Sequence, residues 1–148
     1  MNTTERITNK LNILLGKNYD AEAGYIAAKD NVKDTVLKNF FKERATNRYD
    51  FGHDIKEEIR SLGQKPDKGT SIKGDTHRIW MDLKSTFSKN SDEAVLEEAI
   101  RGEKRAILDY DDVITEPDVP NSTKTILEKH KNNIQNALES LKKLESIA

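Results

Sequence analysis

The chain has 148 residues, which is enough for one domain with a buried core, and we treat residues 1–148 as a single domain. Its 25 lysines and arginines nearly balance 26 aspartates and glutamates, so the net charge of -1 predicts no binding to nucleic acid or to an anionic membrane surface. Cysteine is absent, which excludes disulfides and thiolate chemistry and agrees with a cytoplasmic location. We expect no signal peptide, because the N-terminus has no basic region followed by an apolar run. We expect no membrane span either, because no apolar run approaches the roughly 20 residues that a span requires.

The first predicted helix covers residues 4–29, and Asn2 and Glu5 have the spacing of a capping box at its start. Its core-facing positions recur at alternating steps of four and three residues, which is typical of a helix packed in a bundle. These positions are Ile7, Leu11, Leu14, Asn18, Ala21, Tyr25, Ala28 and Val32. Asn18 is the polar member of the stripe, and Glu22 lies one turn further along its edge.

The second predicted helix covers residues 35–62 and is capped by Asp34. Its apolar side chains gather at its two ends, and they are Val36, Leu37, Phe40, Phe41, Phe51, Ile55, Ile59 and Leu62. Between the two apolar ends, the inward face carries Arg44 and Asn47, with Glu43 beside them. The middle of this helix is therefore polar, like the middle of the first.

Two further long helices follow, at residues 91–115 and 120–146. The first of them has the stripe Leu96, Ile100, Ile107, Tyr110 and Ile114, and Glu103 fills the gap in it. The second has the stripe Leu127, His130, Ile134, Ala137, Leu141, Leu144 and Ala148, with His130 as its polar member. A buried carboxylate such as Glu103 requires charged or hydrogen-bonding partners.

The connection between the second and third long helices predicts the topology. Neighbouring antiparallel helices need only about 2–8 connecting residues, whereas about 28 are present here, including a shorter amphipathic helix at residues 72–88. A crossover of this length makes the second and third helices parallel. The sequence thus predicts an all-α, ferritin-like four-helix bundle whose long crossover contains a fifth, shorter helix.

The polar members of the four stripes should meet near one level of the bundle. One interpretation is a di-metal carboxylate site, with Glu22, Glu43, Glu103 and His130 as ligands of iron or manganese. The Glu-x-x-His spacing of such sites is broken, however. Where a histidine would follow Glu43 and Glu103 by three residues, the chain has Thr46 and Ala106. Where a glutamate would precede His130 by three residues, it has Leu127.

The other interpretation is a structural polar layer, in which Arg44 pairs bidentately with Glu103. The remaining hydrogen bonds would come from Asn18, Tyr25, Asn47, Tyr110 and His130. Such a layer fixes the register of a bundle more than it adds stability. We favour this interpretation over the metal site because the ligand set is incomplete.

Four segments, NYDAEAGY, FFKERA, GTSIKGDTHRIWMDLKS and EEAIRGEKRAILDY, resemble a bacterial family of ferritin-like four-helix-bundle proteins known as a domain of unknown function. The resemblance extends over residues 5–146. It implies a ferritin-like bundle in a cytoplasmic, stress-associated bacterial protein. Members of that family often carry a glutamate just before the glycine of the first segment and a histidine late in the last helix, where this chain has Ala23 and Leu138.

We therefore expect a non-enzymatic ferritin-like protein without a cofactor. The alternative is an iron- or manganese-binding protein with oxidase or storage activity. The sequence is also compatible with a homo-oligomer, because Ile13, Leu15 and Ile26 lie beside the main stripe of the first helix on faces that we predict to be exposed.

Overall fold

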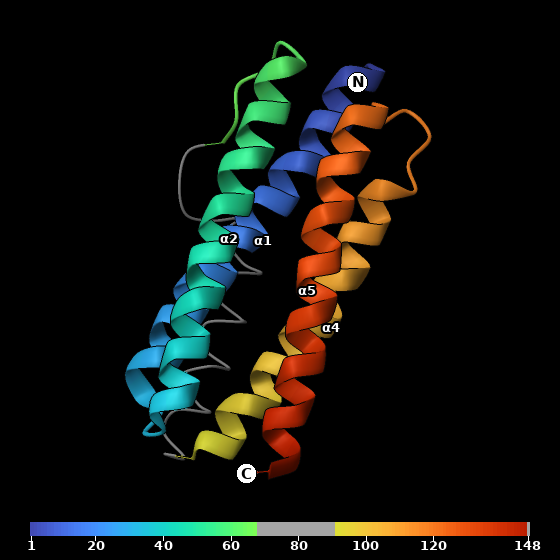
Figure 1. Cartoon of the computed structure of the whole chain (residues 1–148). Helices are drawn as coiled ribbons and strands as arrows, with labels where there is room; N and C mark the ends of the chain where they lie inside the picture. Colours follow the sequence, from blue (N-terminus) through green and yellow to red (C-terminus); the bar gives the residue numbers. More distant parts are fainter. Residues whose placement is uncertain (68–90, 148) are drawn as a thin grey trace.

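The computed structural model describes residues 1–67 and 91–147, which form four long helices (Figure 1). These are α1 (Thr3–Asn31), α2 (Thr35–Ser61), α4 (Asp92–Ile114) and α5 (Asn121–Ile147). The four long helices predicted from the sequence are confirmed, with ends that differ by one or two residues. The shorter helix predicted at residues 72–88 lies outside the described residues.

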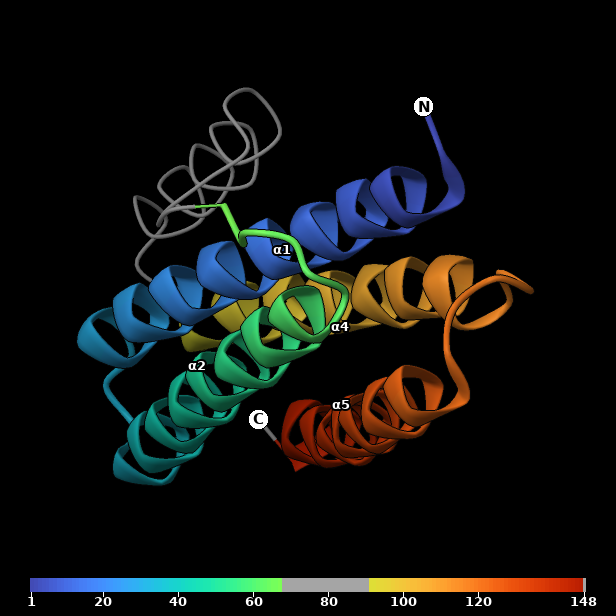
Figure 2. The ribbon, with the colours of Figure 1, turned by 90° about the horizontal axis from the view of Figure 1, so that it is seen from above.

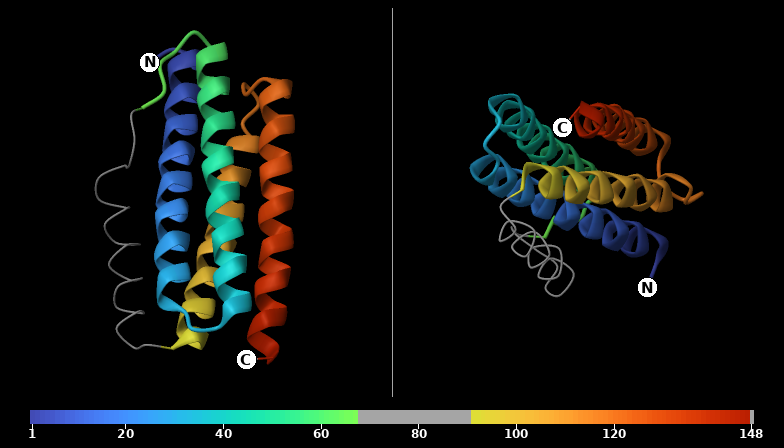
Figure 3. Two further views of the ribbon diagram at one scale, coloured as in Figure 1. Left: turned by 60° about the vertical axis from the view of Figure 1, so that its left-hand side comes forward. Right: turned by 90° about the horizontal axis from the view of Figure 1, so that it is seen from below.

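The helices pack as two antiparallel hairpins, α1 with α2 and α4 with α5. Seen along the bundle, the four helices surround a common interior (Figure 2). Chain direction confirms the predicted topology, because α2 and α4 both run from the lower to the upper end in the first panel of Figure 3. This parallel pair is the arrangement of a ferritin-like bundle. Within the described residues, no helix is long and apolar enough to span a membrane.

The ends of the helices are capped by side chains that the sequence largely identifies. Asn2 Oδ1 accepts a hydrogen bond from the Glu5 backbone N–H at 2.8 Å, and Asp34 Oδ1 accepts one from Val36 at 2.7 Å. At the start of α4 the side chain of Ser91 accepts a hydrogen bond from the backbone N–H of Ala94 at 3.3 Å.

The core consists of two apolar clusters separated along the bundle axis. The upper cluster includes Leu11, Phe51, Ile55, Val113 and Leu127, and the lower cluster includes Phe41, Leu96, Ile100, Leu138 and Leu141. On α1, α2 and α4 the polar residues Asn18, Arg48 and Glu103 lie between the residues of the two clusters, and on α5 His130 lies between Leu127 and Ile134 of the upper cluster. The bundle is therefore apolar at both ends and polar in the middle.

One exposure prediction was wrong, and two others were confirmed. Leu15 is buried at 1% exposure instead of lying on an exposed face, because it points toward α2, where Gly52 has no side chain to obstruct it. Val36, one of the apolar residues at the start of α2, is 61% exposed, whereas its neighbour Leu37 is 4% exposed, so Val36 lies on the solvent face of the helix. Ile13 and Ile26 are exposed as predicted, at 48% and 42%.

Candidate functional site

Glu103 lies at the centre of the bundle on α4 and is 1% exposed. Its Oε2 accepts a hydrogen bond from Arg44 Nη2 at 2.9 Å, and its Oε1 accepts one from Arg48 Nη2 at 2.5 Å. Both arginines come from α2, and each is 3% exposed. Charge-assisted bonds of this length offset part of the desolvation cost of a buried carboxylate, and they hold Glu103 between two cations.

Arg48 is the residue that sequence reasoning missed. The prediction paired both oxygens of Glu103 with Arg44, whereas in the structure one oxygen pairs with Arg44 and the other with Arg48. The prediction also placed Asn47 on the inward face, where the structure has it half-buried. The spacing of residues on α2 does indicate that Arg48 faces the core. Arg44, Arg48, Phe51 and Ile55 follow steps of four, three and four, the same rule that identified the other stripes.

A chain of hydrogen bonds connects this ion pair, which joins α2 and α4, to the other two helices, α1 and α5. Arg48 Nη1 donates to Asn18 Oδ1 on α1 at 2.8 Å, and Asn18 Nδ2 donates to the Tyr110 hydroxyl on α4 at 3.0 Å. The Tyr110 hydroxyl lies 3.0 Å from His130 Nδ1 on α5. His130 Nε2 in turn lies 2.8 Å from Asp54 Oδ2 on α2, where the chain of bonds reaches the surface.

The donors in this chain determine the tautomer of His130. Because Asn18 donates to the Tyr110 oxygen, the Tyr110 hydroxyl proton is free to donate to His130 Nδ1. His130 therefore carries its own proton on Nε2 and donates it to the Asp54 carboxylate. Burial lowers the pKa of His130 below its ordinary value, although Asp54 raises it, and nearby Arg48 lowers it further. The imidazole is consequently neutral near pH 7.

Arg44 makes a second set of contacts toward α5 and α1. Its Nη1 donates to Asn133 Oδ1 at 2.5 Å, and its guanidinium carbon lies 5.9 Å from the centroid of the Tyr25 ring. Tyr25 stacks on Phe41 with 5.8 Å between ring centroids. Burial raises the pKa of the Tyr25 hydroxyl, and the negative charge of Glu103 raises it further. Asn133 was not predicted, because it does not belong to the main stripe of α5.

The centre of the layer has more positive than negative charge. One carboxylate faces two guanidinium groups, and the nearest further carboxylate in the hydrogen-bond chain, that of Asp54, is half-exposed. Within residues 1–67 and 91–147, the Nε atoms of Arg44 and Arg48 are buried without a hydrogen-bond partner. A cationic centre of this kind repels a metal ion.

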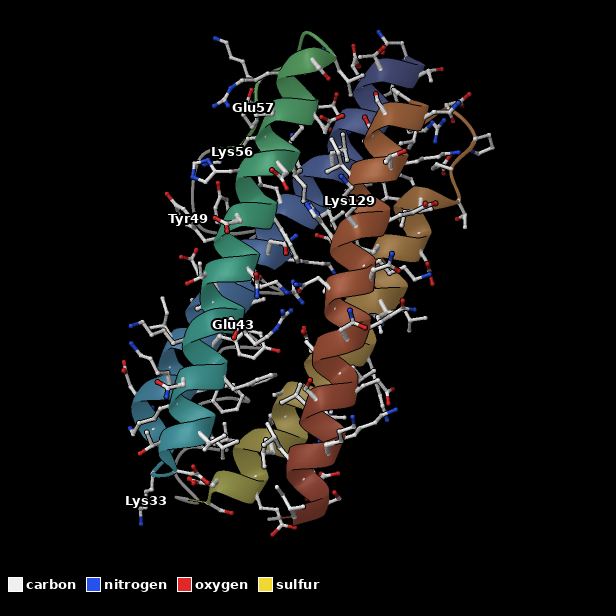
Figure 4. All side chains as sticks on the ribbon, viewed as in Figure 1. Lys33, Glu43, Tyr49, Lys56, Glu57 and Lys129 are labelled. Carbon is white, nitrogen blue, oxygen red and sulfur yellow. The ribbon has the colours of Figure 1, made fainter. Side chains whose placement is uncertain are left out.

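The structure does not bring the four candidate metal ligands together. Glu43 is exposed on α2 (Figure 4), and Glu22 is half-buried on α1, where burial raises its pKa and nearby His53 lowers it. Glu103 and His130 do lie in the layer, but their polar atoms are bonded to protein groups. In the part of the chain that the structure describes, no three His, Asp or Glu side chains are arranged to hold a metal ion. The donor set around Glu103 therefore does not fit the di-metal centre that the fold family implies.

Several solved structures resemble this fold, and they include the following two. One is a two-domain protein from Anabaena variabilis with DJ-1/ThiJ/PfpI-like and ferritin-like domains, at 17% identity and a TM-score of 0.73, covering 99% of this chain and 37% of that chain. The other is a dodecameric thioferritin, a bacterioferritin-related protein from Bacteroides fragilis, at 18% identity and a TM-score of 0.75, covering 97% of this chain and 87% of that one. This chain thus spans little more than a third of the two-domain protein. At these identities the similarity shows the fold alone, which is an all-α ferritin-like bundle.

At the level of sequence, no curated protein matches the chain. Residues 6–116 match the family described as "Domain of unknown function (DUF2383)". The matched region includes Asn18, Arg44, Arg48 and Glu103, so most of the polar layer lies inside it. The match covers well over half of the sequence, and the chain belongs to the DUF2383 family.

Proposed function

We propose that this protein is a non-enzymatic ferritin-like bundle that acts by assembling with copies of itself, and that its central polar layer fixes the bundle's register instead of binding metal. The observation that carries this proposal is the pairing of both Glu103 carboxylate oxygens with Arg44 and Arg48. In a di-metal carboxylate protein, such oxygens would be metal ligands. Here they neutralise arginines.

Electrostatics opposes metal binding at this position. A metal ion bound to Glu103 would have to displace at least one guanidinium group, and both arginines are 3% exposed. The displaced arginine would remain a buried cation beside a second cation, without its partner. Removing one partner of a buried ion pair costs about 3–5 kcal/mol, so metal binding would have to overcome that cost before it gained any affinity.

The same bonds link all four helices at one height. Asn18 lies on α1, Arg48 on α2, Tyr110 on α4, and His130 and Asn133 on α5. Sliding any helix by one turn, about 5.4 Å, would break its bonds and leave buried polar groups unpaired. This supports a role in fixing register, as buried polar residues do in some coiled coils.

Self-assembly is supported by the surface and by the similarity in fold. Ile13, Ile26 and Leu108 are large apolar side chains exposed to solvent. The structurally similar thioferritin from Bacteroides fragilis is dodecameric. A cytoplasmic location and a stress-associated role stay predictions.

Metal analysis tests the first half of the proposal. We expect protein purified without chelators to contain substoichiometric iron and manganese, to oxidise no Fe(II) beyond the buffer rate, and to melt at the same temperature with or without added Fe(II) or Mn(II). An ion present at about 100 times its dissociation constant would add about 2.7 kcal/mol of stability. A clear rise in melting temperature that disappears in Glu103→Gln would instead support the metal-binding alternative.

Sedimentation velocity over a hundredfold range of concentration tests the second half. We expect a species larger than the 16.9 kDa monomer. A protein that stays monomeric at every concentration would contradict a role through self-assembly, whatever its metal content.

A further inference from the structure

An open groove runs along the outer surface between α1 and α4, with a volume of about 360 Å³. Leu14 and Val113 form its floor and are buried. Ile13 on α1 and Leu108 on α4 line its edges and are 48% and 62% exposed. Two large aliphatic side chains in one groove offer apolar surface to a partner, whereas single exposed ones are common on any protein.

The charges of the groove are divided between its two helices. The α1 side carries Lys10 and Lys17, and the α4 side carries Asp112 and Asp109, which pair with those lysines at 3.4 and 3.2 Å. Arg105 of α4 also contacts Asp109, at 3.4 Å. Each lysine thus lies at nearly the same height along the bundle as the aspartate with which it pairs. One side of the groove is cationic, and the other is mainly anionic.

This division makes the groove complementary to itself. A two-fold axis parallel to the helices keeps every residue at its own height and places α1 of one copy opposite α4 of the other. Lys10 then faces the second copy's Asp112, and Lys17 faces its Asp109. An axis across the helices would instead place α1 against α1, with lysines facing lysines. Charge therefore selects the parallel axis.

We propose that the α1–α4 groove is a self-association surface, on which a second copy of this chain docks around a two-fold axis parallel to the helices. Ile13 and Leu108 form the apolar centre of this interface, and the lysine and aspartate rows flank it. The inference rests on the proposed function, because it requires that the protein self-associates, and it specifies the surface and its symmetry.

A charge exchange between two variants is the sharpest test. One variant carries Lys10→Glu and Lys17→Glu, and the other carries Asp109→Lys and Asp112→Lys. Each variant alone places like charges across the interface, so we expect its dimer dissociation constant to rise at least tenfold. An equimolar mixture restores opposite charges on both halves of the interface. We expect it to form a heterodimer about as tight as the wild-type dimer.

The mixture also controls for the pairs within each chain. Those pairs stay broken in both variants after mixing, so recovery can come only from contacts between chains. If both variants dimerise like the wild type, or if mixing restores nothing, the groove is not the interface. If the wild-type protein is itself monomeric, the proposed self-assembly fails together with this inference.

Apolar substitutions give a second test with a matched control. Leu108→Asp should weaken the dimer at least tenfold, because a two-fold interface contains the side chain twice. Val36→Asp is the control, since Val36 is 61% exposed on α2, away from the groove. Equal effects of the two substitutions would overturn the assignment.

Cross-linking tests the orientation of the axis. The chain has no cysteine, so single cysteines report only the intended contact. We expect a mixture of Ile13→Cys and Leu108→Cys chains to form a disulfide-linked heterodimer on mild oxidation. Ile13→Cys alone should cross-link much less. Efficient cross-linking of Ile13→Cys to itself would mean that α1 packs against α1, which would refute the parallel axis.

Discussion

Replacing Glu103 with alanine should destabilise the protein by about 4–5 kcal/mol. The substitution removes the carboxylate that binds Arg44 Nη2 at 2.9 Å and Arg48 Nη2 at 2.5 Å. Both arginines are 3% exposed, so neither can turn to water without opening the bundle. Truncating one partner of a buried ion pair costs about 3–5 kcal/mol, and two cations lose their partner here. The expected value is therefore at the upper end of that range.

Urea unfolding followed by circular dichroism measures the effect. A domain of this size typically has about 5–15 kcal/mol of stability, so the variant should remain folded or close to its midpoint in water. The slope of the free energy against urea should stay unchanged, because the same surface is exposed on unfolding. Glu43→Ala serves as the matched control. Glu43 is an exposed glutamate of α2, and its removal should change stability by no more than about 0.5 kcal/mol.

A triple substitution separates the cost of broken pairing from the net contribution of the layer. Glu103→Leu with Arg44→Met and Arg48→Met removes all three charges and keeps roughly the same side-chain volume. Apolar replacements of buried ion networks are often neutral, or stabilising by about 1–4 kcal/mol. We expect the triple variant to be at least as stable as the wild type and far more stable than Glu103→Ala. A loss below about 1 kcal/mol in Glu103→Ala would refute the reasoning, since it would mean that the arginines find other partners or water.

Three smaller predictions concern single positions. Burial lowers the pKa of His130 in the folded state, so the unfolded state binds more protons as pH falls below about 6.5. The stability of the wild-type protein should therefore decrease below that pH more steeply than the stability of His130→Gln. Parallel pH profiles of the two proteins would contradict this. Asp34→Ala should cost about 1 kcal/mol in urea unfolding, because Asp34 accepts the Val36 N–H at the start of α2. Gly102→Ala should raise stability by up to about 1 kcal/mol, because an added Cβ meets nothing within 4 Å and alanine favours the helix; a lower melting temperature would contradict it.

Much of the fold follows from one periodicity. The steps of four and three residues locate four helices, and the long connection between α2 and α4 makes them parallel. The same stripes identify Asn18, Glu103 and His130 as polar interruptions, and the structure places all three in one layer. A polar residue at a core position is conspicuous in a sequence because it breaks an otherwise regular pattern.

The partners of those residues are harder to predict, for a physical reason. Around the helix, Asn47 lies about 60° to one side of Arg44 and Arg48 about 40° to the other side, so the two are nearly equivalent candidates until the packing of α1 and α4 chooses between them. A long side chain such as that of Arg48 also reaches the core from a wider range of angles than a short one. Asp54 contacts the layer from an exposed position, where a sequence pattern marks nothing unusual. Sequence thus identifies which core positions are polar, whereas three-dimensional packing decides how they are paired.

The position of the layer explains why a bundle without a bound metal would keep buried charges. The apolar clusters above and below it are built from similar aliphatic and aromatic side chains, and such surfaces can pack acceptably in more than one register. A slip of one turn moves Glu103 away from Arg48 and places its carboxylate among apolar residues, where an unpaired charge is costly. The penalty falls on the slipped arrangements and not on the native one. A carboxylate shared between two arginines would then select one alignment of four helices, which in a di-metal protein is a task for the metal ligands.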